Sequence, residues 1–142
     1  MDGVAEWRLV VEFRKLNKVT VNDHFPLPEI ESLLNKQSEF RVWTVIDLRD
    51  AFHQIPLAAA SRNFTAFGTT EGVWRWTVMP MGLAGAPARQ QRMMIDLFGD
   101  LPNVSVYLDD LIVGTGGHQG DSLSDAHQRE VWRFFCAYSR TA

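Results

Sequence analysis

The run Val104-Ser-Val-Tyr-Leu-Asp-Asp-Leu-Ile-Val113 decides the fold, because it places two adjacent carboxylates inside an otherwise apolar stretch. Its flanks, Val104 to Tyr107 and Leu111 to Val113, predict two antiparallel strands joined at a hairpin with Leu108-Asp109-Asp110 at the tip. A tight hairpin of the favoured type needs positive φ at both central positions, which Asp-Asp supplies poorly. Adjacent like charges repel, and a bound cation relieves that repulsion. A solvated turn also accounts for the pair, so the run alone leaves both interpretations open.

A second apolar segment, Arg41 to Ile46, predicts a strand that delivers Asp47 at its C-terminal end. If this strand neighbours the hairpin, Asp47 comes opposite Asp109 and Asp110, and the three carboxylates form a cluster of hard oxygen ligands suited to Mg²⁺ or Mn²⁺. Two such ions can activate an attacking hydroxyl and stabilise a leaving oxygen in phosphoryl transfer. Taken alone, Asp47 fits a helix cap or a surface position equally well, and sequence spacing does not establish the geometry.

The rest of the chain alternates short helices and strands, with no internal repeat or linker between two cores. Further elements are predicted as follows: a strand at 8–13, a helix at 30–36 opened by Pro28, a small helix at 50–54, a hairpin with strands at 64–67 and 73–78, a helix at 87–98, a loop at 114–120 and a final helix at 124–138. This order predicts a mixed α+β fold with an antiparallel sheet.

Composition is that of an ordinary folded domain, with 142 residues, 46% hydrophobic and 22% charged. The single cysteine, Cys136, excludes a disulfide framework and a zinc site built from thiolates. No apolar run reaches membrane-spanning length and the first residues do not read as a signal peptide. We therefore expect an intracellular chain with no membrane partner, in cytoplasm or nucleus.

The net charge of −3 argues at first against a nucleic-acid partner, but the charge is unevenly spread. The segment from Trp7 to Lys18 carries four basic side chains against the single acidic Glu12, which is 4 − 1 = +3 locally. A basic strip beside an acidic pocket suits a protein that holds phosphates with one part and metal ions with another. Ordinary solvated charge explains the strip equally well.

Five ordered motifs together resemble the reverse transcriptases of gypsy-type LTR retrotransposons, over about residues 7 to 130. They are Trp7-Arg-Leu-Val-Val-Glu-Phe-Arg-Lys-Leu-Asn-Lys18, Phe25-Pro-Leu-Pro28, Asp47-Leu-Arg-Asp-Ala-Phe-His-Gln-Ile55, Met79-Pro-Met-Gly-Leu83 with Ala86-Pro-Ala88, and Tyr107-Leu-Asp-Asp110. The resemblance implies a polymerase palm, an antiparallel sheet with helices packed on one face, plus partial fingers. It further implies partial fingers over 1–40 and a palm over 41–142, with the thumb absent.

The activity implied is that of an RNA-directed DNA polymerase fragment, which transfers nucleotides from dNTPs to a primer 3′-hydroxyl with two Mg²⁺ ions, or Mn²⁺. Its implied partners are an RNA or DNA template with primer, within a larger polyprotein that carries thumb, RNase H and integrase regions. Two alternatives stay open, a catalytically inactive remnant or nucleic-acid-binding module, and a metal-dependent nuclease.

The resemblance also assigns residues. Asp47, Asp109 and Asp110 become the catalytic carboxylates and hold the metals, together with the backbone carbonyl of Leu48. The remaining implied residues lie on the nucleotide side (Arg8 at the triphosphate, Phe52 excluding a ribose 2′-hydroxyl, Met81 and Gly82) and on the template or primer side (Pro87, Gln91 and Tyr107).

Two positions depart from the family pattern. Met81 stands where these enzymes usually carry Phe or Gln, and Gln90 replaces the aromatic residue expected after the Pro-Ala turn.

Overall fold

The computed structural model describes residues 9–116 and 122–139, which belong to two compact units interleaved along the chain. The first unit runs to Asn22 and resumes from Phe52 to Ala86; the second comprises Asp23–Ala51 and the chain from Pro87 onward. Each unit is described by itself below, beginning with the second, which contains the sheet with the candidate carboxylates.

The sheet of the second unit has three antiparallel strands in the order β1-β5-β4. Its strands are β1 (Val42–Asp47), β4 (Val104–Tyr107) and β5 (Asp110–Thr115). Successive side chains of each strand point to opposite faces of the sheet. On one face Leu111 and Val113 of β5 are fully buried, and Val104 and Val106 of β4 lie beside them in the same core. This face therefore carries the hydrophobic core of the unit.

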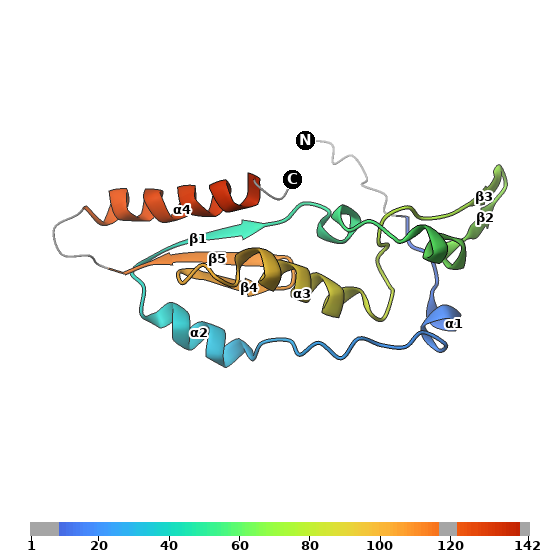
Figure 1. Cartoon of the computed structure of the whole chain (residues 1–142), viewed down its shortest axis with the longest axis horizontal. Coiled ribbons are helices and arrows are strands. Elements are labelled where there is room, and N and C mark those ends of the chain that lie inside the picture. Colours follow the sequence, from blue (N-terminus) through green and yellow to red (C-terminus); the bar gives the residue numbers. More distant parts are fainter. Residues whose placement is uncertain (1–8, 117–121, 140–142) are drawn as a thin grey trace, which may run out of the picture. The chain divides into compact units, whose positions relative to one another are not determined.

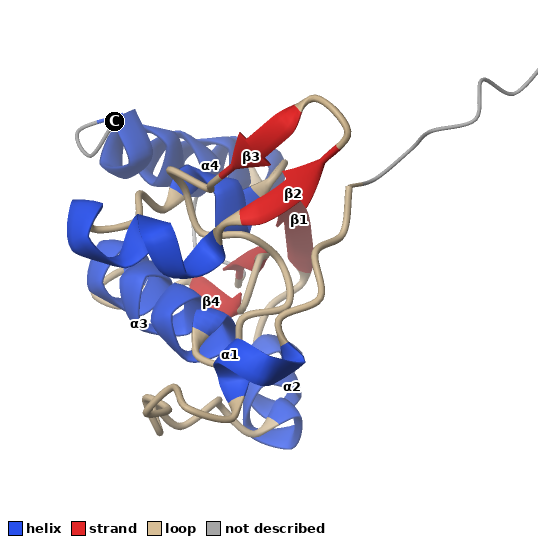
Figure 2. Cartoon of the chain, turned by 90° about the vertical axis from the view of Figure 1, so that its right-hand side faces the viewer, coloured by secondary structure: helices blue, strands red, loops and turns tan. Residues whose placement is uncertain are grey.

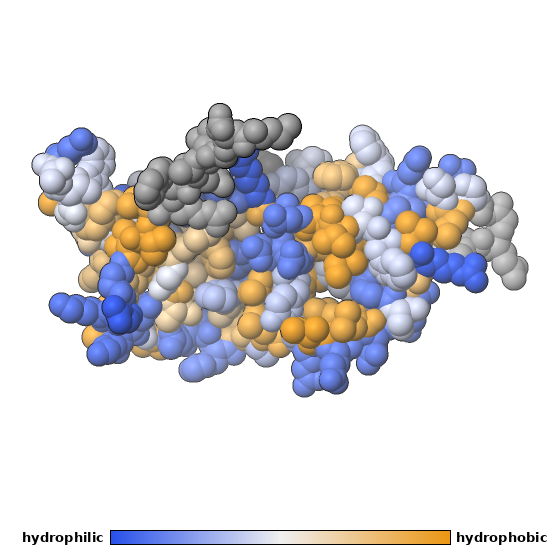
Figure 3. Space-filling model, turned by 180° about the vertical axis from the view of Figure 1, so that it is seen from behind, coloured by the Kyte–Doolittle hydropathy of each residue, from blue (hydrophilic) through white to orange (hydrophobic). Residues whose placement is uncertain are grey.

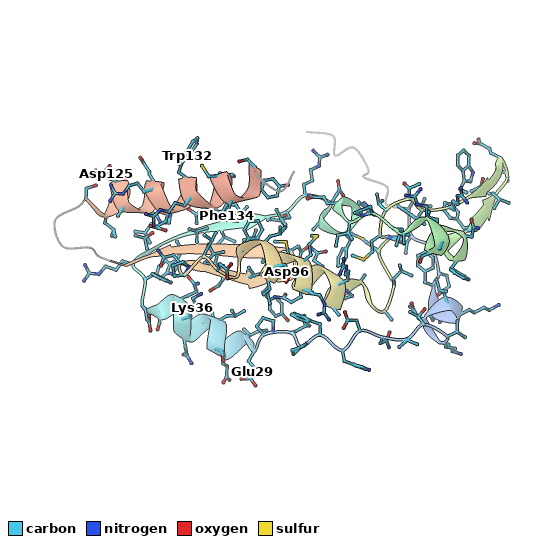
Figure 4. The ribbon with its side chains drawn as sticks, in the orientation of Figure 1. Glu29, Lys36, Asp96, Asp125, Trp132 and Phe134 are labelled. Carbon is cyan, nitrogen blue, oxygen red and sulfur yellow. The ribbon has the colours of Figure 1, made fainter. Side chains whose placement is uncertain are left out.

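Helices α3 (Ala86–Phe98) and α4 (Leu123–Ser139) supply the other half of this core. Phe98 of α3 and Phe134 of α4 are buried, and their ring centroids lie 4.8 Å apart. Figure 4 shows Phe134 directed from α4 towards the sheet and Trp132 directed away from it. In agreement, Phe134 is 2% exposed and Trp132 is 70% exposed. The mixed α+β prediction with an antiparallel sheet is confirmed.

The opposite face of the sheet is largely open. Trp43, Val45 and Asp47 alternate along β1 on this face and are all exposed. Helix α2 (Ile30–Ser38) covers only one part of it, where Gln37 donates to the hydroxyl of Ser105 at 2.6 Å. Lys36 donates to the Val104 carbonyl at 2.9 Å. Figure 1 and Figure 2 show α2 and α4 on opposite sides of the sheet, and on the α2 side Trp43, Val45 and Asp47 remain exposed.

The first unit is built from short elements. These are α1 (Arg14–Asn17), two 3₁₀ turns at Ala51–Gln54 and Ala59–Thr65, and the hairpin of β2 (Phe67–Thr69) and β3 (Gly72–Trp74) seen in Figure 2. Phe13, Ile55 and Met79 are buried in this unit, and the Met79 amide donates to the Ile55 carbonyl at 2.8 Å. The backbone of this unit is thus held by short helical turns, one hairpin and single hydrogen bonds such as that between Met79 and Ile55.

Most predicted elements are confirmed, including the carboxylate hairpin, the strand before Asp47 and the helices after Pro28 and Pro87. The final helix is confirmed as α4. The strand predicted at 8–13 is wrong: residues 9–13 are irregular and α1 follows at once. Leu9 and Val10 are 65% and 73% exposed, and no strand among the described residues pairs with them. An apolar run without a pairing partner does not make a strand.

Further boundaries differ, among them that of the strand predicted at 73–78, which the structure limits to Gly72–Trp74. The predicted loop from Gly114 begins later, because β5 continues to Thr115, whose carbonyl accepts the Arg41 amide at 2.9 Å. Residues 117–120 of that loop lie outside the described part. The predicted strand at 64–67 is replaced by a 3₁₀ turn up to Thr65 and a shorter strand from Phe67.

The compact units do not follow the predicted boundary between residues 40 and 41. Helix α2 groups with the sheet because Lys36 and Gln37 bond to β4, whereas residues 52–86 group with α1. The assignment of fingers and palm stays a prediction about polymerase anatomy.

Large apolar side chains also reach the surface. In the view from behind in Figure 3, apolar patches are interspersed with polar ones. Within residues 9–116 and 122–139, no helix is both long enough and apolar enough to cross a bilayer.

Candidate functional site

Asp47 and Asp110 face each other across two neighbouring strands. Asp47 is the last residue of β1 and pairs in register with Asp110, the first residue of β5. Side chains directly opposite in an antiparallel pair share one face, with Cβ atoms about 4.5–5.5 Å apart. Tyr107 of β4 pairs with Asp110 from the other side, so Asp47, Asp110 and Tyr107 form one row on the open face. Both carboxylates are exposed to solvent.

Asp109 lies in the turn that leads into this row. Its carbonyl accepts the amide of Leu48 at 3.3 Å, which ties the exit of β1 to the hairpin. The Leu48 side chain packs against the hydrophobic core, and this packing holds the Leu48 backbone in place. The prediction that Asp47 lies on a strand adjacent to the hairpin is confirmed, with Asp110 as its direct partner.

The turn itself has an unusual backbone. Tyr107 and Asp110 are paired, which leaves Leu108 and Asp109 as a two-residue connection. Leu108 has φ +55°, whereas Asp109 is not in the positive-φ region. Positive φ at the first central position alone is the pattern of a type II′ turn, which normally takes glycine there. For a bulky residue this conformation costs on the order of 1–3 kcal/mol and persists only where its surroundings hold it.

Gln91 of α3 is the side chain that holds it. The Leu108 amide donates to Oε1 of Gln91 at 2.7 Å, and Nε2 of Gln91 donates to the Val106 carbonyl at 3.2 Å. Gln91 has no exposed surface. Its place on the template or primer side stays a prediction; in the structure its amide oxygen and nitrogen both bond to the hairpin backbone, so the side chain supports the hairpin from within the core.

The donor set fits a hard divalent cation. Two carboxylates share one face across a strand pair and a third lies in the adjoining turn, all from oxygen-bearing side chains. Among residues 9–116 and 122–139, no three acidic, histidine or cysteine side chains are close enough together to hold a metal ion. The backbone brings the three aspartates to one end of the sheet, but their side chains as placed do not form a ligand cluster within the described residues.

The residues predicted on the nucleotide side belong to the first unit. Phe52 is half-buried in the turn Ala51–Gln54, and Met81 is exposed. Gly82 has φ +91°, a conformation that favours glycine. Arg8 lies outside the described residues. Pro87, predicted on the template side, is half-buried in the first turn of α3 in the second unit.

Asn17 holds the turn at Gly82 in a way that sequence patterns do not reveal. Its Nδ2 donates to the Gly82 carbonyl at 2.8 Å, and its Oδ1 accepts the Ala84 amide at 2.9 Å. Asn17 stands within the first of the five motifs, but a polar residue at a helix end gives no signal of a distant partner.

Part of the basic strip is internally paired. Glu12 accepts hydrogen bonds from the side chain and the backbone amide of Arg14, and these bonds hold the pKa of the Glu12 carboxyl below its ordinary value. The same contact raises the pKa of Arg14. Arg14 is thus engaged locally, which leaves less of the strip for a phosphate.

Residues 2–137 match the family described as reverse transcriptase (RNA-dependent DNA polymerase). The chain is 41% identical over 110 residues to the retrovirus-related Pol polyprotein from transposon 412 of Drosophila melanogaster, which covers 76% of this chain and 9% of the relative. It is 35% identical over 113 residues to the Pol polyprotein from transposon gypsy of the same species, with 78% and 11% covered. The chain therefore spans about a tenth of the length of these curated relatives.

The fold is similar to that of a foamy viral protease-reverse transcriptase in complex with double-stranded DNA, with a TM-score of 0.78 and 25% identity. That match covers 92% of this chain and 23% of the other. The foamy viral protease-reverse transcriptase in complex with an RNA/DNA hybrid matches with a TM-score of 0.75 and 25% identity, over 92% of this chain and 18% of the other.

Proposed function

This chain belongs to the reverse transcriptase (RNA-dependent DNA polymerase) family, as its five motifs indicated, and on that premise we propose that it carries the nucleotidyl-transfer site of a polymerase. The reaction joins the 3′-hydroxyl of a primer to the α-phosphate of a deoxynucleoside triphosphate, with pyrophosphate as the leaving group. The template is RNA or DNA, in keeping with the double-stranded DNA and RNA/DNA hybrid named for the structural relatives.

The row of Asp47 and Asp110 beside the Asp109 turn is the observation that carries this proposal. In it, Asp47 and Asp109 hold divalent ions, Asp110 supports them, and the Leu48 carbonyl adds a backbone ligand. Reverse transcriptases generally use divalent metals, and when bound such ions polarise the attacking hydroxyl and stabilise the leaving oxygen. The exposure of both paired carboxylates leaves them accessible to an incoming phosphate.

Other residues orient the substrates. Phe52 lies below the sugar and excludes a 2′-hydroxyl by steric overlap, while the guanidinium of Arg8 binds the triphosphate through paired hydrogen bonds. Met81 and Gly82 border the nucleotide, and Pro87 and Tyr107 lie towards the template and primer. These roles rest on the family resemblance of the motifs that contain them.

The relatives are named as Pol polyproteins, many times longer than this chain. We extend that organisation to the parent protein of this chain, with thumb, RNase H and integrase regions on the same polyprotein.

A second candidate function is a nucleic-acid-binding remnant without catalysis. It draws on the finding that the three aspartates do not converge into a ligand cluster among the described residues.

The deciding experiment compares primer extension and nuclease digestion, with Mg²⁺ and with Mn²⁺, in a longer Pol protein that contains these residues. Extension that Asp110→Asn abolishes supports the proposal. Metal-dependent digestion without extension identifies a nuclease, and binding of primer–template without either activity identifies the remnant.

A companion measurement uses the chain itself. We expect Mn²⁺ to broaden the NMR signals of Asp47 and Asp109 selectively, and Asp109→Asn to weaken the binding. Asp96→Asn, an exposed acidic residue on α3 outside the row, is the matched control. Equal binding in all three chains would contradict the assignment of the metal ligands.

A further inference from the structure

Gln91 is a polar side chain in an apolar position, and each of its amide atoms has a defined partner. The residue sits on α3 with no exposed surface, among the helix positions that face the core. Its oxygen accepts from the Leu108 amide and its nitrogen donates to the Val106 carbonyl. Rotating the amide by half a turn would oppose donor to donor and acceptor to acceptor, so its orientation is fixed.

These two contacts bracket the start of the carboxylate turn. Val106 is on β4, two residues before Leu108, and Leu108 is the residue with positive φ. A buried backbone amide that loses its acceptor costs about 1–3 kcal/mol, similar to the strain of a bulky residue at positive φ. The Gln91 oxygen therefore offsets that strain by satisfying the amide only in the conformation that is observed.

We propose that Gln91 is a positioning residue of the nucleotidyl-transfer site, which holds Leu108 in the left-handed conformation and so sets the direction of Asp109 and Asp110. The inference rests on the proposed function for its link to metal binding, but its claim about the turn stands on the structure alone. Asp109 follows Leu108 directly, so a backbone rotation at Leu108 turns Asp109 away from β1 and breaks its 3.3 Å contact with the Leu48 amide.

The neighbouring residue provides a matched control. Gln90 is equally buried on the same helix, yet neither of its amide atoms has a hydrogen-bond partner. Gln91→Leu and Gln90→Leu are thus the same chemical change at adjacent buried positions, and only the first removes contacts to the hairpin.

The first readout is the Leu108 amide, followed by NMR in the whole chain. In Gln91→Leu we expect its hydrogen exchange to accelerate by about tenfold relative to the core amides of β5, with Leu108 Cα and Cβ shifts that leave the positive-φ range. In Gln90→Leu the Leu108 signals stay as in the wild type. An unchanged Leu108 in Gln91→Leu would overturn the proposal.

The second readout is the affinity for Mn²⁺, measured by its broadening of the Asp47 and Asp109 signals. Residues that orient metal ligands typically change metal affinity by about 10- to 100-fold when replaced, and we expect a loss in this range for Gln91→Leu only. A shifted Leu108 with unchanged affinity would overturn the positioning role. A wild-type chain that binds no Mn²⁺ would instead overturn the proposed function, while the Leu108 signals still decide the turn.

In the variant Gln91→Glu, the hydrogen bonds of residue 91 to the hairpin depend on pH. A protonated glutamic acid reproduces both contacts, with its hydroxyl donating to Val106 and its carbonyl accepting from Leu108. Burial raises the pKa of a carboxyl, so the neutral form dominates at low pH and the charged form, which cannot donate, at high pH. We expect wild-type Val106 and Leu108 shifts at low pH and, at high pH, a change that begins at Val106, because the carboxylate no longer donates to its carbonyl. Wild type and Gln90→Leu over the same range are the controls, and Val106 and Leu108 signals that follow theirs at every pH would contradict the proposal.

Discussion

Two amide side chains secure the turns in which Gly82 and Leu108 have positive φ. Asn17 donates to and accepts from the backbone around Gly82, and Gln91 does the same around Leu108. Both residues lie far along the sequence from their partners: Asn17 is 65 residues from Gly82, and Gln91 is 17 residues from Leu108. Hydrophobic periodicity identifies neither of them, because a polar residue within a helical pattern reads equally well as a solvated one.

The carboxylates themselves were predictable. An acidic pair that interrupts an apolar run and a single aspartate that ends another are visible in the sequence, and the register now brings Asp47 opposite Asp110. The direct partner was less predictable, because only the structure shows a two-residue turn with positive φ at Leu108 and not at Asp109. The sequence offered no glycine to mark that position.

Replacement of Phe52 tests the proposed sugar selection. In a polymerase-competent longer protein, Phe52→Val removes ring volume and we expect it to admit ribonucleotides by opening space for the 2′-hydroxyl. The measurement is the ratio of ribonucleotide to deoxynucleotide incorporation. Ile55→Val, also apolar and on the same segment but buried at 6% exposure, is the control and leaves the ratio unchanged. An unchanged ratio in Phe52→Val would show that the ring serves packing alone.

Gln90 is expected to be replaceable with a gain in stability. It occupies the place of an aromatic residue in the family pattern, is fully buried, and has no partner for either amide atom. A buried polar group without a hydrogen bond costs about 1–3 kcal/mol. We therefore expect Gln90→Leu to raise the free energy of unfolding by about 1–2 kcal/mol, measured by urea denaturation. A decrease would mean that the amide is satisfied by water or that the site needs its volume.

At the scale of elements, pairing decides what the sequence pattern leaves open. The strand before Asp47 was predictable as an apolar run, and the structure supplies its pairing partner in β5. The apolar run from Leu9 to Phe13 has the same composition but no partner strand among the described residues, and only Phe13 is buried. Local composition cannot distinguish the two cases, since strand pairing is a long-range property.

Helix α4 is joined to the sheet by a polar contact as well as by its apolar side. His127 contacts the hydroxyl of Thr44 on β1 through Nε2 at 2.8 Å and that of Thr115 on β5 through Nδ1 at 2.9 Å. Thr115 has no exposed surface, so its hydroxyl depends on this partner. The sequence gives no signal of this contact, because both threonines lie on distant strands.

Loss of His127 should therefore loosen α4. We expect His127→Leu to lower the free energy of unfolding by about 1–3 kcal/mol, because it leaves a buried hydroxyl without a partner. Gln128→Leu, at the next and exposed position, is the control and changes stability by less than about 0.5 kcal/mol. In a double-mutant cycle with Thr115→Val, a coupling energy near zero would contradict the contact.

At the scale of the whole molecule, the two units are interleaved along the chain, so no single sequence boundary separates them. Residues 23–51 leave the first unit to supply α2 and β1, and the chain returns to the first unit from Phe52 to Ala86. The proposed metal ligands all lie in the second unit, whereas Phe52, Met81 and Gly82 lie in the first. Sequence order alone gave no indication of this exchange.

The chain of 142 residues is expected to bind divalent ions without acting as a polymerase by itself. Affinity for a nucleic-acid duplex comes mainly from basic side chains that neutralise several phosphates, and it falls steeply with salt. The net charge is −3, and Arg14 within the one basic strip is already paired with Glu12. A weakly held primer terminus is poorly placed for attack, and small misplacements of reacting atoms can cost about 10²-fold in rate. The ion site needs no such grip, because its ligands all lie between Asp47 and Asp110 on one sheet.

We therefore expect Mn²⁺ binding that Asp109→Asn weakens, weak and strongly salt-sensitive binding to primer–template, and no primer extension above background. Fluorescence anisotropy across a salt series and a gel-based extension assay measure the last two, with a longer Pol protein that includes the same residues as the positive control. Robust extension by the 142-residue chain at physiological salt would show that two small units with a net negative charge can hold a primer terminus in place. In that case the duplex must be gripped by surfaces other than the strip from Trp7 to Lys18, and the phosphate contacts would have to be sought on the open face of the sheet beside Asp47 and Tyr107.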